Sequence, residues 1–206
     1  MAKSSKAFSK VALVLYSSDK NVQQHWQQQL ETVQINTSKQ QKAVVLFHLT
    51  DTAGLQLPAL KKLIEQGSKV LVLVDTLQVE QGVQLFRQGV KGYLETFTPT
   101  ALLLRAVDQV EQGRVWLGQD IMAALIQQVN TSDEDPATLE ERLLNANFTP
   151  REMEVAKGVL AGESNKTIAE TLFISERTVK AHVHALLRKK QVKDRLAFVI
   201  KIKKER

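Results

Sequence analysis

Four basic side chains recur along one stretch of the sequence at the spacing of an α-helix. Arg177, Lys180, His184 and Arg188 are three or four residues apart, so at about 100° per residue they fall on one side of a helix. Lys and Arg pair with phosphate groups and reach the acceptor atoms of guanine in the major groove. The chemistry that this stretch could perform is the recognition of a nucleic acid.

The same stretch carries an apolar side opposite the basic one, as expected of a helix that packs against its own domain. The members of the apolar side are Val179, Val183, Leu186 and Leu187. Ala181 lies between Lys180 and His184, and its small side chain would allow close approach to base edges or to a thymine methyl group. A solvated surface helix is the alternative interpretation of such a pattern.

The segment before this helix begins with a strong capping signal. Thr149 is a good N-cap, Pro150 fits the first helical turn, and Glu152 completes a capping box. We expect this first helix to end at Gly162, because glycine commonly terminates helices.

Two further serines predict two further helices. Ser164 can cap a short helix over Asn165–Leu172, and Ser175 can cap the basic helix, which we expect to run to Lys190. Two short helices joined by a tight turn at residues 173–174 have the layout of a helix-turn-helix.

The net charge of +6 is unevenly distributed along the 206 residues. Residues 146–206 contain 14 Lys or Arg and 7 Asp or Glu, whereas residues 1–145 contain 14 and 15. A basic module beside a neutral one favours a polyanionic partner.

Composition excludes several classes of protein. The absence of cysteine excludes disulfides, thiolate zinc sites and cysteine nucleophiles, and it fits a reducing compartment, so we expect a cytoplasmic protein. The apolar run Val11–Tyr16 is too short to span a bilayer. Because no Gly-rich strand-to-helix turn occurs and no histidine pairs with an acid and a nucleophile, we expect neither an enzyme nor a metal site.

The N-terminal half alternates short aliphatic runs with longer amphipathic stretches, which is typical of βα units around a parallel sheet. The expected strands are Val11–Tyr16, Thr32–Ile35, Ala43–Leu49, Lys69–Val74 and Gly89–Leu94. The pattern predicts an α/β doubly wound domain of the flavodoxin-like kind, followed by an all-α domain.

Helices are expected between and after these strands, each with its own start signal. The expected helices are one capped by Asp19 and ending near Glu31, Leu57–Gln66 with Pro58 in its first turn, Leu77–Gln88 after Asp75 with Gln78 completing a capping box, one from Thr98-Pro99 to near Gly113, and Asp120–Val129. Residues 130–147 are rich in polar and acidic residues and predict a linker. We therefore expect three parts: 1–115, 116–145 and 146–206.

The C-terminal part resembles the LuxR-type helix-turn-helix domain of bacterial transcription regulators. The matching runs are Phe148–Val155 (FTPREMEV), Gly162–Ala169 (GESNKTIA) and Leu172–Lys180 (LFISERTVK), continuing through His182, Leu186 and Lys193–Arg195. The resemblance implies a sequence-specific regulator that binds double-stranded DNA at a two-fold symmetric or direct-repeat site.

The resemblance also implies roles for particular residues. Lys180, Ala181 and His184 would face bases, whereas Glu154 would be an internal scaffold residue. Phosphates would be contacted by Asn165, Lys166, Thr178 and Arg188. The last helix often forms a dimer interface in this family, so we expect a homodimer, with RNA polymerase or another regulator as a further partner.

The first domain resembles the receiver of a response regulator of the NarL/FixJ type. The resemblance rests on the order of strands and helices, on Gly89–Leu94 (GVKGYL) and on Glu111–Leu117 (EQGRVWL). A receiver uses an acidic pair for magnesium, an aspartate nucleophile, a hydroxyl and a lysine, because phosphoryl transfer needs its charge neutralised in place.

All five receiver positions are changed in this sequence. They hold Ser17, Ser18, His48, Val74 and Thr96. We therefore expect a pseudo-receiver that is not controlled by aspartyl phosphorylation.

Four residues near these positions leave alternatives open. Asp19, Asp51 and Asp75 follow strands and could be displaced pocket acids, although helix caps or turn residues are the favoured interpretation. His48 could accept phosphate or bind a metal, but no partner histidine clusters with it.

One branch of such regulators, which controls biofilm matrix genes, binds cyclic di-GMP through Trp, an apolar residue, Ser or Thr, and Arg. The corresponding residues here are Trp116, Leu117, Gly118 and Gln119. The first two fit, but neutral Gln119 cannot replace the arginine that stacks on guanine and pairs with phosphate. Cyclic di-GMP is thus an alternative ligand and not an expected cofactor.

A third mode of control is protein docking through the helix after this motif. Met122, Leu125, Ile126 and Val129 could form an apolar contact between subunits, or they could pack within their own chain.

Overall fold

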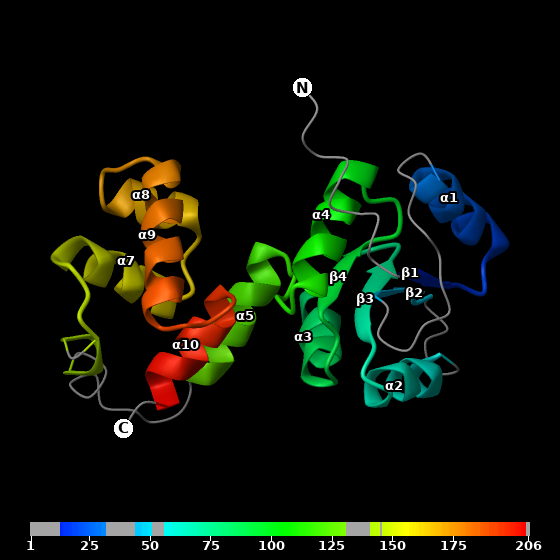
Figure 1. The fold of residues 1–206 in the computed structure, drawn as a ribbon, viewed down its shortest axis with the longest axis horizontal. Coiled ribbons are helices and arrows are strands. Elements are labelled where there is room, and N and C mark those ends of the chain that lie inside the picture. The colour runs from blue at the N-terminus through cyan, green and yellow to red at the C-terminus, as the bar shows by residue number, and fades with distance from the viewer. Residues whose placement is uncertain (1–12, 32–43, 51–55, 131–140, 145, 205–206) are drawn as a thin grey trace. The chain divides into compact units, whose positions relative to one another are not determined.

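The computed structural model divides the chain into two units, residues 1–118 and 119–206 (Figure 1). The structure describes residues 13–31, 44–50, 56–130, 141–144 and 146–204. Within these ranges, no helix is long and apolar enough to cross a membrane.

The first unit is built on a parallel sheet whose described strands lie side by side in chain order. The strands are β1 (Leu13–Tyr16), β2 (Val44–His48), β3 (Lys69–Val74) and β4 (Gly92–Glu95). Every residue of β2 and all but the first of β3 are buried. Continuous apolar runs of this kind occur in parallel strands that are covered on both faces.

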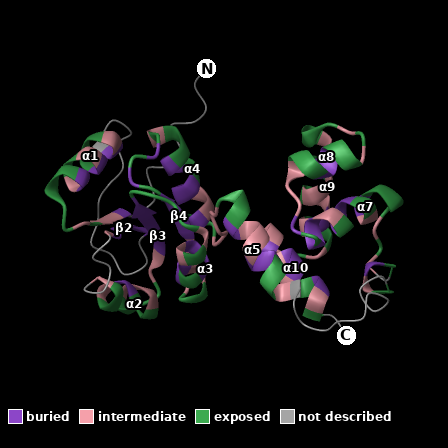
Figure 2. Ribbon diagram, turned by 180° about the vertical axis from the view of Figure 1, so that it is seen from behind, coloured by how far each residue is buried: buried purple, intermediate pink, exposed green. Residues whose placement is uncertain are grey.

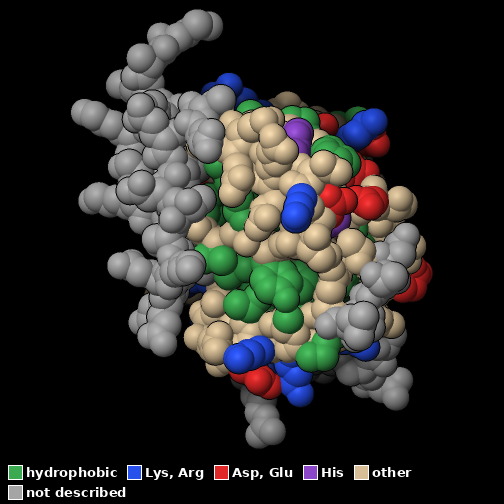
Figure 3. Space-filling model, turned by 90° about the vertical axis from the view of Figure 1, so that its right-hand side faces the viewer, with side chains coloured by type: hydrophobic (Ala, Val, Ile, Leu, Met, Phe, Trp, Pro, Cys, Tyr) green, Lys and Arg blue, Asp and Glu red, His purple; other side chains and the backbone are tan. Residues whose placement is uncertain are grey.

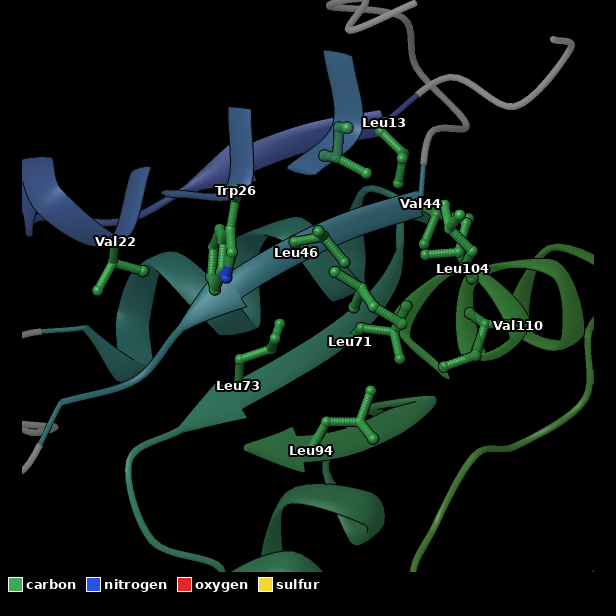
Figure 4. Close-up of a cluster of buried hydrophobic side chains, with 14 residues drawn as sticks. Leu13, Val22, Trp26, Val44, Leu46, Leu71, Leu73, Leu94, Leu104 and Val110 are labelled. Atoms are coloured by element: carbon green, nitrogen blue, oxygen red, sulfur yellow. The ribbon is translucent and has the colours of Figure 1, made fainter. Parts of the chain in front are cut away.

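Helices lie on both faces of the sheet, which confirms the predicted doubly wound fold. On one face, α1 (Lys20–Glu31) and α4 (Thr100–Glu111) pack on alternate strand residues such as Leu46 and Leu71 (Figure 4). On the other face are α2 (Leu57–Glu65) and α3 (Val79–Arg87). The hydroxyl of Tyr93 in β4 donates to Gln81 Oε1 of α3 at 2.6 Å.

Trp26 fixes α1 against the carboxyl end of the sheet. Its side chain is fully buried in the core, and its indole Nε1 donates to the carbonyl oxygen of Thr96 at 3.0 Å. A buried indole that satisfies its only donor in this way combines a large apolar contact with a specific orientation.

The expected strand Thr32–Ile35 lies outside the described residues. The last strand begins at Gly92 and not at Gly89, because Gly89 has φ +106° and its N–H bonds to Phe86 O at the end of α3. That left-handed residue ends the helix, so the extended backbone starts later.

Two of the predicted helix caps are wrong. α3 begins at Val79 and not at Leu77, so the capping box expected from Asp75 to Gln78 is not formed; the Gln78 N–H donates instead to Tyr93 Oη at 3.2 Å. The N-cap of α4 is Pro99, and Thr98 uses its hydroxyl to donate to Glu95 O at 2.7 Å. The predicted cap of α1 is confirmed, since Asp19 Oδ1 accepts from Asn21 N at 2.7 Å.

The second unit is helical, as predicted for the C-terminal domain. Its labelled helices are α5 (Gln119–Asn130), α7 (Pro150–Leu160), α8 (Asn165–Thr171), α9 (Glu176–Lys189) and α10 (Arg195–Lys204). Within the expected linker, residues 141–144 are also helical. Helix α5 packs against α10 and buries Leu125 and Ile126, so these side chains serve the core of their own unit.

Thr149 and Glu152 form the predicted capping box at the start of α7. Glu152 Oε2 accepts from Thr149 N at 2.8 Å and also from Lys189 Nζ, in the last turn of α9, at 2.6 Å. The bond from Lys189 and that from the Thr149 amide hold the pKa of the buried Glu152 carboxyl below its ordinary value. One carboxylate therefore joins the beginning of α7 to the end of α9.

We expect Glu152→Gln to destabilise the helical unit by on the order of 1–2 kcal/mol at neutral pH, because a charged hydrogen bond is lost. The contribution of Glu152 is fully present above the ordinary pKa of 4.5 and is lost as the pH falls through its lower folded-state pKa. Urea unfolding followed by far-ultraviolet circular dichroism should thus show a gap between variant and wild type that narrows in acid. Glu170→Gln, which removes an exposed partner of Lys166, is the control and should have little effect. An equal gap at all pH values would contradict this account.

We expect Gly92→Ala to destabilise the first unit by about 1–3 kcal/mol through overpacking. A Cβ at Gly92 would lie 2.1 Å from Leu71 Cδ2, whereas a Cβ at Gly118 would have no neighbour within 4 Å. Both tryptophans, Trp26 and Trp116, belong to this unit, so their fluorescence during urea unfolding reports on it alone. Gly118→Ala should leave the transition unchanged, and equal effects of the two substitutions would disprove the packing argument.

Candidate nucleic-acid interface

Helix α9 presents one basic and one apolar side, as the sequence predicts. The five residues of the basic side, here called the recognition face, are all exposed; they are Arg177, Lys180, Ala181, His184 and Arg188. On the opposite side Val179 and Leu186 are buried, and Val183 and Leu187 are half-buried. Buried positions gather on the inner sides of the helices of this unit (Figure 2).

The start of α9 is fixed by its cap and by the turn before it. Ser175 Oγ accepts from Thr178 N at 3.1 Å, and the two hydroxyls lie 2.8 Å apart. Phe173, in the turn after α8, has φ +53° and is 94% exposed. The left-handed region is unfavourable for the backbone of a bulky residue, so the turn before α9 has a specific, strained backbone conformation.

Arg151 hydrogen-bonds to the same turn, and the exposure of its partner Glu154 corrects one expectation. Its Nη2 donates to Leu172 O at 2.9 Å, and its Nη1 donates to Glu154 Oε2 at 2.5 Å. Glu154 was expected to be internal, but its side chain is 47% exposed. It orients Arg151 from the surface, whereas Glu152 is the buried carboxylate of α7.

The lysines expected to contact DNA already have weak partners on their own helices. Lys180 Nζ lies 3.8 Å from Glu176 Oε2, and Lys166 Nζ lies 4.0 Å from Glu170 Oε1. Because all four side chains are well exposed, such pairs contribute little to stability. Either lysine can exchange its partner for a phosphate or a base at small cost.

Asn165, expected to contact a phosphate, is held by a residue whose role the sequence reasoning missed. Arg195 Nη1 donates to Asn165 Oδ1 at 3.4 Å, and Nη2 donates to Val159 O at 3.4 Å and to Glu163 O. Burial lowers the pKa of Arg195 to about 10, so it remains charged at neutral pH. A basic residue at the first position of a helix gave no sequence signal for this internal role.

Three of the five positions expected to depart from a receiver pocket lie together at the carboxyl end of the sheet. Ser17 Oγ lies 3.0 Å from Nδ1 of His48, which is only 2% exposed, and the His48 ring is edge-on to Trp26. Thr96 is buried beside the same indole, to which its carbonyl is bonded. Ser17, His48 and Thr96 thus lie at the edge of the sheet where the resemblance predicts the pocket of a receiver.

The two remaining altered positions also make local contacts. Ser18 Oγ accepts from Gln56 Nε2 at 3.2 Å, and Val74 is a buried apolar residue whose carbonyl accepts from the Thr96 N–H at 2.8 Å.

Of the three acids expected near this edge, the structure describes Asp19 and Asp75. Asp19 caps α1, and Asp75 is 67% exposed with its Oδ1 3.6 Å from His48 Nε2, too long for a hydrogen bond. Asp51 lies outside the described residues. Among the residues that the structure describes, no three His, Cys, Asp or Glu side chains group together as metal ligands.

Trp116 serves the sheet of the first unit. Its backbone carbonyl accepts from Tyr93 N at 3.0 Å, and its backbone N–H donates to Lys91 O at 2.8 Å. Its ring packs against the core. Leu117 is half-buried, and Gln119, exposed at the start of α5, donates to Gly162 O at 3.4 Å. These contacts explain Trp116 as a packing residue, while its use by a nucleotide stays a hypothesis.

Comparison with known proteins gives consistent results. Residues 146–202 match the family described as bacterial regulatory proteins, luxR family. The nitrate/nitrite response regulator protein homolog of Haemophilus influenzae is 34% identical over 76% of this chain and 72% of its own length. The transcriptional regulatory protein DegU of Brevibacillus brevis is 31% identical over 69% of this chain and 65% of its own length.

Among solved structures, the response regulator ChrA of a heme-sensing two-component system is similar over 94% of this chain and 96% of its own. It is 24% identical, with a TM-score of 0.43. The family match, the sequence relatives and the helix-turn-helix geometry agree. The chain belongs to the NarL/FixJ-type response regulators and is a DNA-binding transcriptional regulator with a LuxR-family helix-turn-helix domain.

Proposed function

We propose that the chain reads its DNA site with the recognition face of α9 in the major groove. Lys180, Ala181 and His184 would contact base edges, with Lys180 reaching guanine acceptors. Asn165, Lys166, Thr178 and Arg188 would bind flanking phosphates. The observation that carries this proposal is the exposure of the whole basic side of α9 opposite a buried apolar side.

The proposed binding form is a homodimer on a two-fold symmetric or direct-repeat site, since one helix reads only a few base pairs. Selection of bound sequences from random duplex DNA tests this directly. We expect a motif of two half-sites spaced by about one helical turn, and recovery of no motif would contradict the proposal.

We further propose that the receiver-like unit works without aspartyl phosphorylation. Ser17 and His48 are bonded to each other, and Thr96 is buried where a receiver has its lysine. Phosphoryl transfer needs a carboxylate nucleophile and a neutralising cation in one place, and the described residues supply neither. Control would then depend on protein level or on a partner.

Substitution of Lys180 should separate base reading from phosphate binding. We expect Lys180→Ala to cost about 1–3 kcal/mol on the selected site and little on unrelated DNA. Arg188→Ala is the matched control. It should weaken binding to both kinds of DNA alike and reduce the slope of log affinity against log salt by about 1, the effect of one phosphate contact. The measurement is a titration by fluorescence anisotropy at several salt concentrations. If Lys180→Ala weakened binding to the selected site and to unrelated DNA equally, Lys180 would not be a base-contacting residue.

Incubation with acetyl phosphate and Mg²⁺ should leave the protein unmodified, because no described carboxylate is placed as a nucleophile. Intact-mass spectrometry should show no added phosphoryl group, and DNA affinity should not change. A receiver with an intact aspartate pocket, treated in parallel, verifies the reagent. A phosphoryl group mapped to Asp19, Asp51 or Asp75 would overturn the proposed mode of control.

A further inference from the structure

The turn between α8 and α9 holds a phenylalanine at a position that favours glycine. The Phe173 N–H donates to Glu170 O at 3.3 Å. The Ile174 N–H donates to Ala169 O at 3.0 Å. This pair of bonds is the Schellman motif that ends many helices, and its left-handed residue is usually Gly and sometimes Asn. Phe173 occupies that position with φ +53°. Its Cβ makes the conformation unfavourable, so backbone preference does not account for a phenylalanine here.

The side chain of Phe173 is also unusually exposed. It is 94% exposed, whereas the other exposed large apolar side chains among the described residues are 36–64% exposed. On the face of the first unit shown in Figure 3, hydrophobic side chains gather at the centre, but the ring of Phe173 is almost entirely open to solvent. Core packing therefore does not account for the phenylalanine either.

Neighbouring contacts hold this turn in place at the start of the recognition helix. Arg151 Nη2 donates to Leu172 O at 2.9 Å, and Ile174 is half-buried. Ser175, the N-cap of α9, follows Phe173 by two residues, so their Cα atoms are at most about 7 Å apart. The exposed ring therefore lies beside the first turn of α9.

The position of the ring limits what it can contact on DNA. The N-terminal residues of a recognition helix are the ones that contact base edges in the major groove. A group about 7 Å from them lies within about two base pairs, because base pairs are stacked about 3.4 Å apart. A phenyl ring has no hydrogen-bonding atom for a phosphate or a polar base edge. Its partner in the major groove is the apolar 5-methyl group of thymine.

We propose that Phe173 contacts the 5-methyl group of a thymine next to the base pairs that the recognition face contacts. The inference rests on the proposed function and adds one base to the sequence that each protomer selects. DNA is favoured over a protein partner because the ring lies beside the end of α9 that enters the groove. The conformational cost of Phe173 in the turn is then offset by a contact made only on DNA.

Phe173→Asn tests the contribution of the ring. Asn tolerates the left-handed region, so the urea midpoint of the variant, followed by far-ultraviolet circular dichroism, should be no lower than that of wild type. Its affinity for the selected site, measured by fluorescence anisotropy, should fall about fourfold per half-site, the effect of exposing one buried methyl group. Leu144→Asn, which removes another exposed apolar side chain, is the control and should bind as wild type.

Replacement of single thymines by uracil locates the contact, because uracil lacks only the methyl group. At one thymine of each half-site, uracil should weaken binding of wild type about fourfold. The same replacement should not affect Phe173→Asn, since the two changes remove one and the same contact. A thymine contacted by another residue, such as Ala181, should respond alike in both proteins.

The inference is overturned if Phe173→Asn binds the selected site as tightly as wild type, or if every uracil replacement weakens the two proteins alike. A selected motif that contains no thymine would overturn it as well. A lower urea midpoint for the variant would show that the ring serves the fold, which also contradicts the inference. If wild type selects no site, or if Lys180→Ala keeps the wild-type sequence preference, the proposed function fails instead, and that result is distinct from these.

Discussion

The Glu152 carboxylate is the interaction on which the second unit depends, because it joins the first turn of α7 to the last turn of α9. It accepts from Thr149 N and from Lys189 Nζ while buried. With the Ser175 cap at the other end, α9 is held at both termini. Its apolar side can then be buried while its basic side stays exposed, and this orientation is what a DNA-reading helix requires.

The first unit has the parallel sheet and the covering helices expected of a receiver domain. Parallel strands bring Ser17, His48 and Thr96 to one edge, where ligands of such sheets commonly bind. In this chain those side chains bond to one another or lie buried against Trp26. Packing and hydrogen bonds hold this edge of the sheet together, and under the proposed function it works without phosphoryl transfer.

The sequence predicts best those features that depend on local chemistry. The caps at Thr149, Ser164 and Ser175 and the two sides of α9 follow from residue type and helical spacing, and the structure confirms them. The capping box expected from Asp75 to Gln78 and the cap expected at Thr98 are not formed, because Gln78 N–H bonds to Tyr93 and the Thr98 hydroxyl to Glu95. The internal role of Arg195 was not predictable, since its carbonyl partners come from residues about 30 positions earlier.

The absence of cysteine offers the most direct test of the central claim, that the basic side of α9 faces the DNA. A single cysteine introduced in place of Arg177 can carry an iron chelate that cleaves nearby DNA. A cysteine in place of the exposed Gln127 of α5 is the control. We predict cleavage within the selected site from position 177 and little from position 127. Stronger cleavage of the site from position 127 would contradict the proposed orientation of the domain on DNA.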